Sequence, residues 1–239
     1  MNRLHTARSL RDDQRAFSRL REDELGTASA AALGIAVSPI PALAVAALLG
    51  SSGKLRTASA FVAGEALAVG AIAALVVVVA AGSLEASLES TLAFMQIGIG
   101  ALLLLLLIAH ARATRYVPAS ARVLAALDGV RPPAAFVSGV AMVAVNPKNL
   151  ALALAGGAAI LELDQTGSLD AVTVVAFTAL AVSLLVAEVA AYALSPERAA
   201  RLLAGGRDFT LRHERVVVNV VLLGLAVLFL VRGTLDLLR

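Results

Sequence analysis

The feature that most constrains this chain is a series of long stretches without a charged residue. No residue from Leu25 to Gly53 carries a charge, and neither does any residue of Thr91–Ala109. A helix needs ~20 apolar residues to cross the ~30 Å hydrocarbon core of a bilayer. With 59% hydrophobic and only 15% charged residues, the chain holds more apolar surface than a soluble domain of 239 residues can bury. The sequence therefore predicts an all-α, polytopic membrane protein.

Six segments have the composition of membrane-spanning helices, and the sixth is somewhat short. They are Leu25–Gly53, Ala58–Gly82, Thr91–Ala109, Ala134–Leu161, Ala171–Leu194 and Val216–Val231. Lysine and arginine gather in the connections after the first, third and fifth segments, whereas the other two connections hold acidic residues only. The positive-inside rule then places the basic connections in the cytoplasm and both termini outside. In the fifth connection, Ser195–Pro196 and Gly205–Gly206 are expected to interrupt helical structure.

The two halves of the chain share a pattern that predicts an inverted repeat. Ser38–Pro39 interrupts the first apolar segment, and Asn146–Pro147 interrupts the fourth at a similar depth. Three spans per half would insert the second half upside down, as in many secondary transporters. The predicted organisation is a charged tail (1–25), a three-helix repeat (26–111), a basic cytoplasmic linker (112–133) and a second three-helix repeat (134–239).

The prolines at these positions should break their helices. Proline removes a backbone donor and clashes with the preceding turn, and Pro41 reinforces the effect of Pro39. Unpaired backbone groups at this depth are tolerated where they line a cavity or are covered by protein. The pattern favours a binding site over two proline kinks that serve only packing.

Lys148 is the most informative single residue, because a lysine near the centre of a span costs ~3 kcal/mol on insertion. It follows Pro147, so it should lie in the first turn of a half-helix, where free N–H groups and the helix dipole favour an anion. Asn146 and Asn149 would supply further donors. A structural role, with Lys148 neutralised by Glu65 or Glu188, is equally compatible with the pattern.

Glu65 and Glu188 are the two acidic residues within the apolar segments. Together with Lys148 they leave a formal charge of −1 in the core, so one of them should be protonated or face water. Both are therefore candidates for proton coupling or for an ion pair with Lys148. Hydration in a cytoplasmic vestibule is the alternative for each.

The chemistry missing from the sequence excludes several function classes. There is no cysteine, and the three histidines lie in or beside charged stretches, so we expect no metal site, no cofactor and no intramembrane enzyme. A nucleotide-binding loop is missing as well, so transport would need an ion gradient, the energy of a partner or a downhill path. The basic residues are explained by membrane topology, and no nucleic-acid partner is expected.

Two motifs resemble those of a known family. Gly34–Pro41 reads Gly-Ile-Ala-Val-Ser-Pro-Ile-Pro, and Val145–Ala151 reads Val-Asn-Pro-Lys-Asn-Leu-Ala. They look like the motifs of the GAP or Sap family, the glycolipid- and sulfolipid-addressing proteins of actinobacterial envelopes, and the resemblance covers roughly Gly26–Leu235. That family is placed in the LysE exporter superfamily, whose members carry a proline-rich motif in the first span and an Asn-Pro motif in the fourth.

The resemblance implies six spans, a location in the plasma membrane and a role in moving envelope lipids or their precursors outward. Carried over by motif, the expected substrate-binding residues are Ser38, Pro39, Pro41, Asn146, Pro147, Lys148 and Asn149. The leading hypothesis is an exporter or flippase for an envelope lipid or another anion. The alternatives are an accessory scaffold for a larger lipid exporter and a LysE-like exporter of amino acids or small solutes. Membrane lipids are the expected partners, and a homodimer or a larger export complex stays open.

Overall fold

The computed structural model is all-helical over the residues that it describes, as the sequence predicts. Within this part of the chain no strand occurs. The described residues are 22–50, 54–81, 88–112, 127, 129–163 and 167–238. The tail before residue 22 and most of the basic linker lie outside the described residues.

Two helices break at the predicted prolines. The helix Glu22–Ala36 ends just before Ser38, and α2 (Pro39–Gly50) continues at a bend of 45°. α6 (Pro132–Val145) and α7 (Pro147–Leu161) are separated by Asn146 alone and bent by 76°. Each second helix begins with a proline because the first helical position needs no N–H donor. The predicted interruptions of the first and fourth apolar segments are therefore confirmed.

A third bend has no proline and was not predicted. α8 (Gly167–Ala181) and α9 (Ser183–Leu194) meet at Val182 with a bend of 58°. The Ser183 hydroxyl donates to the carbonyl oxygen of Leu180 at 2.7 Å. A serine side chain that bonds to the backbone in this way competes with the regular helical pattern and bends helices.

The three remaining helices are uninterrupted. They are α3 (Lys54–Ala81), α4 (Leu88–Arg112) and α10 (Pro196–Leu237). The expectation that Gly205–Gly206 would interrupt the fifth connection is wrong, because the backbone of α10 stays helical through both glycines. Each glycine lowers the stability of a helix but does not prevent one from forming. Here the helical turns on both sides of Gly205–Gly206 continue through the pair.

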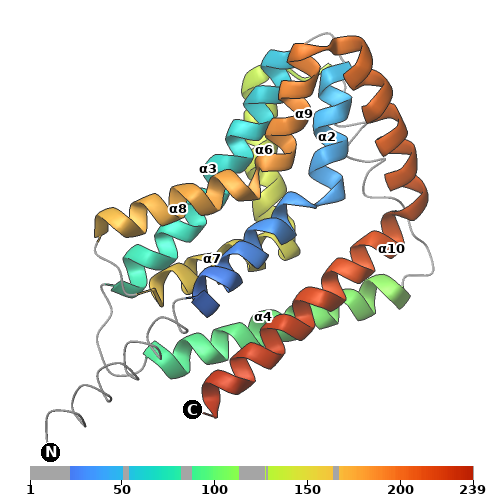
Figure 1. Ribbon diagram of the computed structural model, residues 1–239. Helices are drawn as coiled ribbons and strands as arrows, with labels where there is room; N and C mark the ends of the chain where they lie inside the picture. The colour runs from blue at the N-terminus through green and yellow to red at the C-terminus, as the bar shows by residue number, and fades with distance from the viewer. Residues whose placement is uncertain are drawn as a thin grey trace, which may run out of the picture.

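The helices form two groups (Figure 1). α2, α6, α9 and the first parts of α3 and α10 lie together at one end, whereas Glu22–Ala36, α7, α8 and α4 lie across the other end. Each of the three bent pairs contributes one helix to each group, and α3 and α10 run through both. Two buried clusters follow this division: one gathers around Leu152 and Phe229, and the other around Leu48 and Phe61.

Among the described residues, Leu55–Val78 is the one helix that is long and apolar enough to cross a membrane unaided. The number of candidate spans rises to four if each bent pair forms one span. The apolar part of α10, Leu222–Leu235, is shorter than a span, so the predicted count of six is not reached by these criteria. Large apolar side chains such as Val78, Val175 and Leu75 point outward, as in a protein surrounded by lipid.

Candidate functional site

The two helix breaks come together in space through Lys148. Its Nζ atom donates a buried hydrogen bond of 2.7 Å to the carbonyl oxygen of Gly34, on the last turn of the helix Glu22–Ala36. That carbonyl has lost its helical donor because the N–H of Ser38 bonds to Ile35 instead, at 3.0 Å. The lysine of the second break thus binds a backbone group exposed by the first. The side chain is buried, with 8% of the residue exposed.

The first turn of α7 is capped by its own sequence. The Oδ1 atom of Asn146 accepts from the N–H of Lys148 at 3.1 Å and from the N–H of Asn149 at 3.4 Å. The expectation of free N–H groups at this helix end is therefore wrong for these two residues. Asparagine is among the strongest capping residues, since its short side chain reaches back to the orphan donors. Asn146 consequently fixes the start of α7 and the position from which Lys148 projects.

Asn149 and Glu65 supply buried polar groups without partners. Both polar side-chain atoms of Asn149 are buried and make no hydrogen bond, and the residue has no exposed surface. Glu65, on α3, is 1% exposed, and its Oε2 atom also lacks a hydrogen-bond partner. Glu65 is the acidic residue whose charge acts on Lys148, although the two side chains form neither an ion pair nor a hydrogen bond. Because unpaired polar groups are costly in an apolar interior, such a cluster is typical of a functional site.

Glu65 is held in place by an unusually close contact between α3 and α6. A Cβ atom on Gly64 would overlap the carbonyl oxygen of Phe136, and one on Gly139 would overlap that of Phe61. The same Cβ on Gly139 would lie 2.9 Å from the backbone nitrogen of Glu65. Glycine at both crossing points lets the two backbones touch.

This contact follows a repeated sequence that our sequence analysis missed. Residues 61–64 read Phe-Val-Ala-Gly and residues 136–139 read Phe-Val-Ser-Gly. Each phenylalanine carbonyl faces the glycine of the other copy, and the two helices run in the same direction (Figure 1). The repeated Phe-Val-X-Gly pattern is the signal that identifies the pair.

The predicted residues occupy different positions around this centre. Ser38 is buried in the first break, and Pro39 and Pro41 lie in the first turn of α2. Asn146 and Pro147 form the second break, where Asn146 is half-buried and Pro147 is exposed.

Glu188 belongs to a separate environment. It lies on α9 beside residues of the second buried cluster, such as Leu185 and Val189. Its Oε2 atom is buried without a hydrogen-bond partner, and the electrostatic interaction of Lys148 is with Glu65. Of the two glutamates proposed as partners of Lys148, Glu65 is the one whose charge acts on it, without a direct ion pair.

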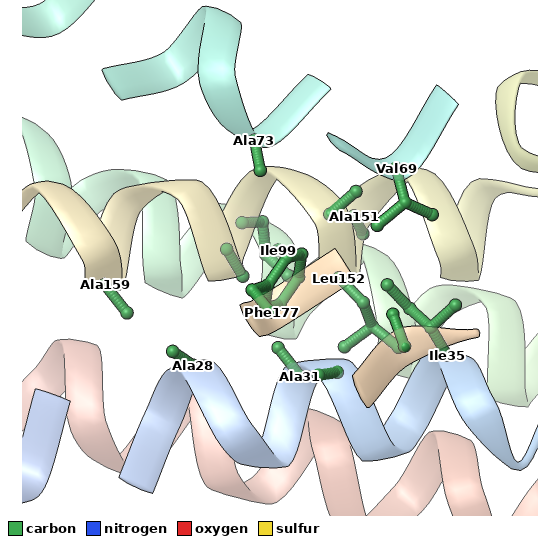
Figure 2. Packing of buried hydrophobic residues seen from close by; sticks show 14 of the residues in the cluster. Ala28, Ala31, Ile35, Val69, Ala73, Ile99, Ala151, Leu152, Ala159 and Phe177 are labelled. Atoms are coloured by element: carbon green, nitrogen blue, oxygen red, sulfur yellow. The ribbon is translucent and has the colours of Figure 1, made fainter. Parts of the chain in front are cut away.

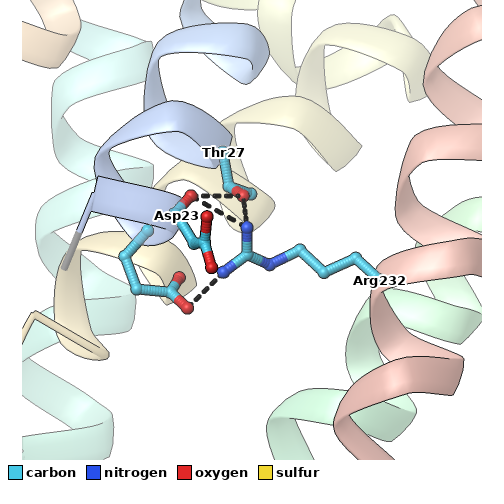
Figure 3. A network of polar contacts seen from close by, with 4 residues as sticks. Asp23, Thr27 and Arg232 are labelled. Atoms are coloured by element: carbon cyan, nitrogen blue, oxygen red, sulfur yellow. Dashed lines mark hydrogen bonds and ion pairs between the residues drawn. The ribbon is translucent and has the colours of Figure 1, made fainter. Parts of the chain in front are cut away.

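A second polar cluster escaped the sequence analysis (Figure 3). Arg232, near the end of α10, forms an ion pair with Glu24 and donates to the hydroxyl of Thr27. It also donates to the carbonyl oxygen of Asp23 at 2.8 Å. We call Arg232, Glu24 and Thr27 the Arg232 cluster. The signal was available, because Arg232 is the first charged residue after a long apolar run and Glu24 is the last one before another.

Fold and site together define a helical membrane protein with a buried ionic centre where two interrupted helices meet. The chain belongs to the family described as Sap, sulfolipid-1-addressing protein, whose model matches residues 29–234. Neither the curated proteins nor the solved structures include a match to this chain. The family match confirms the resemblance to the addressing proteins and indicates a role in lipid addressing or export in membranes.

Proposed function

We propose that this protein is a secondary exporter or flippase-like carrier that moves an anionic envelope lipid outward across the bacterial plasma membrane. The observation that carries the proposal is the buried Lys148, which joins the two helix breaks and interacts with Glu65. A buried cation at a break between half-helices is a typical binding element for anionic substrates in secondary transporters. The name of the family, sulfolipid-1-addressing protein, supports a sulfated or otherwise anionic lipid as cargo.

The geometry supports a binding step in which the substrate replaces internal partners. An anionic headgroup would compete with the Gly34 carbonyl and with Glu65 for the ammonium group of Lys148. The unpartnered amide of Asn149 could then donate to a headgroup oxygen. The remaining residues of the proposed binding site are Ser38, Pro39, Pro41, Asn146 and Pro147, which shape the two breaks. Asn146 acts by capping α7, since its Oδ1 atom already serves the backbone.

The proposal includes six spans arranged as a 3+3 inverted repeat, with both termini outside. The spacing between Pro39 and Pro147 is 147 − 39 = 108 residues, and each proline starts the second half of a bent pair. The third helices of the two halves, α4 and α10, pack against each other. Such packing is expected if a pseudo-twofold axis that relates the two halves passes between these helices. Placement in the LysE superfamily is part of this proposal.

We propose further that transport involves no chemical conversion and no cofactor. Glu65 and Glu188 are candidates for carrying a proton during the cycle, because each has a buried carboxylate oxygen without a hydrogen-bond partner. The expected partners are membrane lipids, and a homodimer or a larger export complex is compatible with the proposal. Amino acids or small solutes would be the cargo if the protein works like other LysE-type exporters.

A second function is favoured by one specific observation. The bond between Lys148 and Gly34 spans 114 residues of sequence and ties the two halves of the chain together. Such a tie would also serve an accessory scaffold for a larger lipid exporter. In that case the buried centre is structural, and the basic residues of the linker, including Arg112 and Arg131, recruit the partner.

The test compares surface-extractable with total polar lipids in a deletion strain of the source organism. The strain would carry the wild-type protein, Lys148→Ala, or Arg112→Glu with Arg131→Glu, all at equal membrane abundance. Arg198→Gln is the matched control, because it removes one exposed positive charge from the first turn of α10. The transport proposal expects a lipid class to leave the surface on deletion and to return with wild type and Arg198→Gln but not with Lys148→Ala.

Full rescue by Lys148→Ala would contradict transport through this centre. Stronger damage from the linker reversal than from Lys148→Ala would favour the scaffold. No change in any lipid on deletion would overturn lipid export, and small solutes would then be measured in the same strains.

A further inference from the structure

The helix Glu22–Ala36 is held by side-chain contacts at each of its ends. Near its start, Arg232 of α10 binds Glu24, Thr27 and the carbonyl of Asp23. Near its end, the Gly34 carbonyl accepts from Lys148 of α7. Glu24 and Gly34 are ten positions apart in the sequence, which corresponds to ~15 Å of helix. The two contacts therefore lie at opposite ends of one short rigid element.

Between these contacts the buried face of the helix carries small side chains. They are Ala28, Ala31 and Ala32, and large side chains of the same buried cluster, such as Leu152, lie nearer the end of the helix, where Ile35 is buried. Figure 2 shows Ala28 facing Ala159 of α7, whereas Leu152 and Phe177 lie closer to Ala31 and Ile35. Small side chains interdigitate little, so a displacement along this surface disturbs few contacts.

The contrast with α3 and α6 identifies which part of the fold stays fixed. At that contact, backbone lies against backbone, and an added Cβ on Gly64 or Gly139 would overlap a carbonyl oxygen. Interfaces of this kind have one arrangement, whereas the alanine surface permits several. The element held by polar contacts at its ends is thus the one whose packing lets it move.

We propose that Glu22–Ala36 is a movable gate, and that the Arg232 cluster holds it closed over the Lys148 centre. When Arg232 is released, the helix Glu22–Ala36 pivots at the break near Ser38. This motion opens the Lys148 centre to water on the side of the membrane where the start of this helix and the end of α10 lie. The assignment of this motion to a transport cycle rests on the proposed function. The gate itself is a statement about conformation and can be tested without any substrate.

The lack of cysteine makes the wild-type chain a ready background for thiol labelling. Ser38→Cys places a thiol in the first break, where the native residue is 2% exposed. The full-length protein in detergent micelles would be labelled with a water-soluble maleimide. The matched control is Val62→Cys, a position that is 7% exposed on α3 in the other buried cluster.

Into both backgrounds we would introduce Arg232→Gln, which removes the charge, and Arg232→Lys, which keeps the charge but loses the forked donor geometry. The proposal expects Arg232→Gln to raise the labelling rate at Ser38→Cys by about tenfold, because labelling of a buried thiol follows the open population. Arg232→Lys should give a smaller increase. The labelling rate at Val62→Cys should stay unchanged in both variants.

Two results would overturn the gate. Unchanged labelling of Ser38→Cys in both Arg232 variants would show that the cluster does not control access. An equal rise at Ser38→Cys and Val62→Cys would show general loosening of the fold. A faster rate at Ser38→Cys alone, together with full lipid rescue by Lys148→Ala, would keep the gate and remove the proposed lipid path.

Discussion

A buried lysine needs both a partner for its charge and acceptors for its hydrogens. Lys148 has Glu65 for the first and the Gly34 carbonyl for the second. The sequence reduced the possible charge partners to Glu65 and Glu188, because few charged residues lie within the apolar segments. It did not indicate Gly34, because a backbone carbonyl becomes an acceptor only when the local hydrogen bonding changes, here by the bond from Ser38 to Ile35.

Removing the charge of Lys148 should destabilise the protein unless Glu65 is neutralised as well. We expect Lys148→Met to lower the free energy of unfolding by about 3 kcal/mol, because it leaves a buried carboxylate without its counter-charge. The double variant Lys148→Met with Glu65→Gln should recover most of the loss. Thermal unfolding of the detergent-solubilised protein measures both. Additive losses in the double variant would show that the two residues are not coupled.

The cap at the start of α7 gives a second prediction at this scale. Asn146→Ala should lower stability by about 1 kcal/mol, because the N–H groups of Lys148 and Asn149 lose their acceptor. Asn146→Ser should retain most of the stability, since serine also caps helices. Thermal unfolding of the two variants side by side is the measurement. Equal losses would show that the amide of Asn146 has a role beyond capping.

At the scale of elements, proline marked two bends and left the third unmarked. The breaks before Pro39 and Pro147 follow from the missing backbone donor of proline, and the prolines can be recognised in the sequence alone. The bend at Val182 depends on one serine hydroxyl, and serines in apolar helices often leave the helix straight. The contact between α3 and α6 was also not predicted from the sequence. Gly64 and Gly139 lie far apart in the chain, and their role becomes clear only once the two helices are known to cross at these positions.

The glycines at helix contacts should respond to alanine in opposite ways according to their surroundings. Gly139→Ala and Gly64→Ala should each destabilise the protein by about 2 kcal/mol, because the new methyl group would overlap a carbonyl oxygen. Gly224→Ala and Gly98→Ala are the controls, since a Cβ at either position meets no atom within 4 Å. These controls should be neutral or stabilising by up to about 1 kcal/mol. Thermal unfolding that fails to separate the two pairs would contradict the close α3–α6 contact.

At the scale of the molecule, the division into two groups of helices follows from the bends. Each bent pair sends one helix into each group, so the positions of the breaks set where the two buried clusters separate. Apolar composition predicted helices in a membrane but not this division. The angle between two half-helices is decided by the neighbours on which each one packs, and a single sequence does not show which helices those are.

The proposed six-span topology makes a prediction about sidedness. A cysteine at Leu238, near the end of α10, should react with a membrane-impermeant thiol reagent in intact cells. A cysteine at Ser120, in the basic linker, should react only after the cells are permeabilised. Labelling followed by a shift in electrophoretic mobility distinguishes the two. Equal reactivity of both positions in intact cells would contradict an odd number of spans between them.

The bond between Lys148 and Gly34 also has a consequence for how the protein is made. While only the first half of the chain has left the ribosome, Glu65 enters the bilayer with no counter-charge and the Gly34 carbonyl with no donor. A charged residue alone at the centre of a span costs ~3 kcal/mol. That cost persists until the segment with Lys148 is synthesised and docks against the first half. The first half of this protein is therefore stabilised in the bilayer only once the fourth apolar segment has been made, and a nascent chain truncated before Lys148 is the form that a membrane quality-control protease would find.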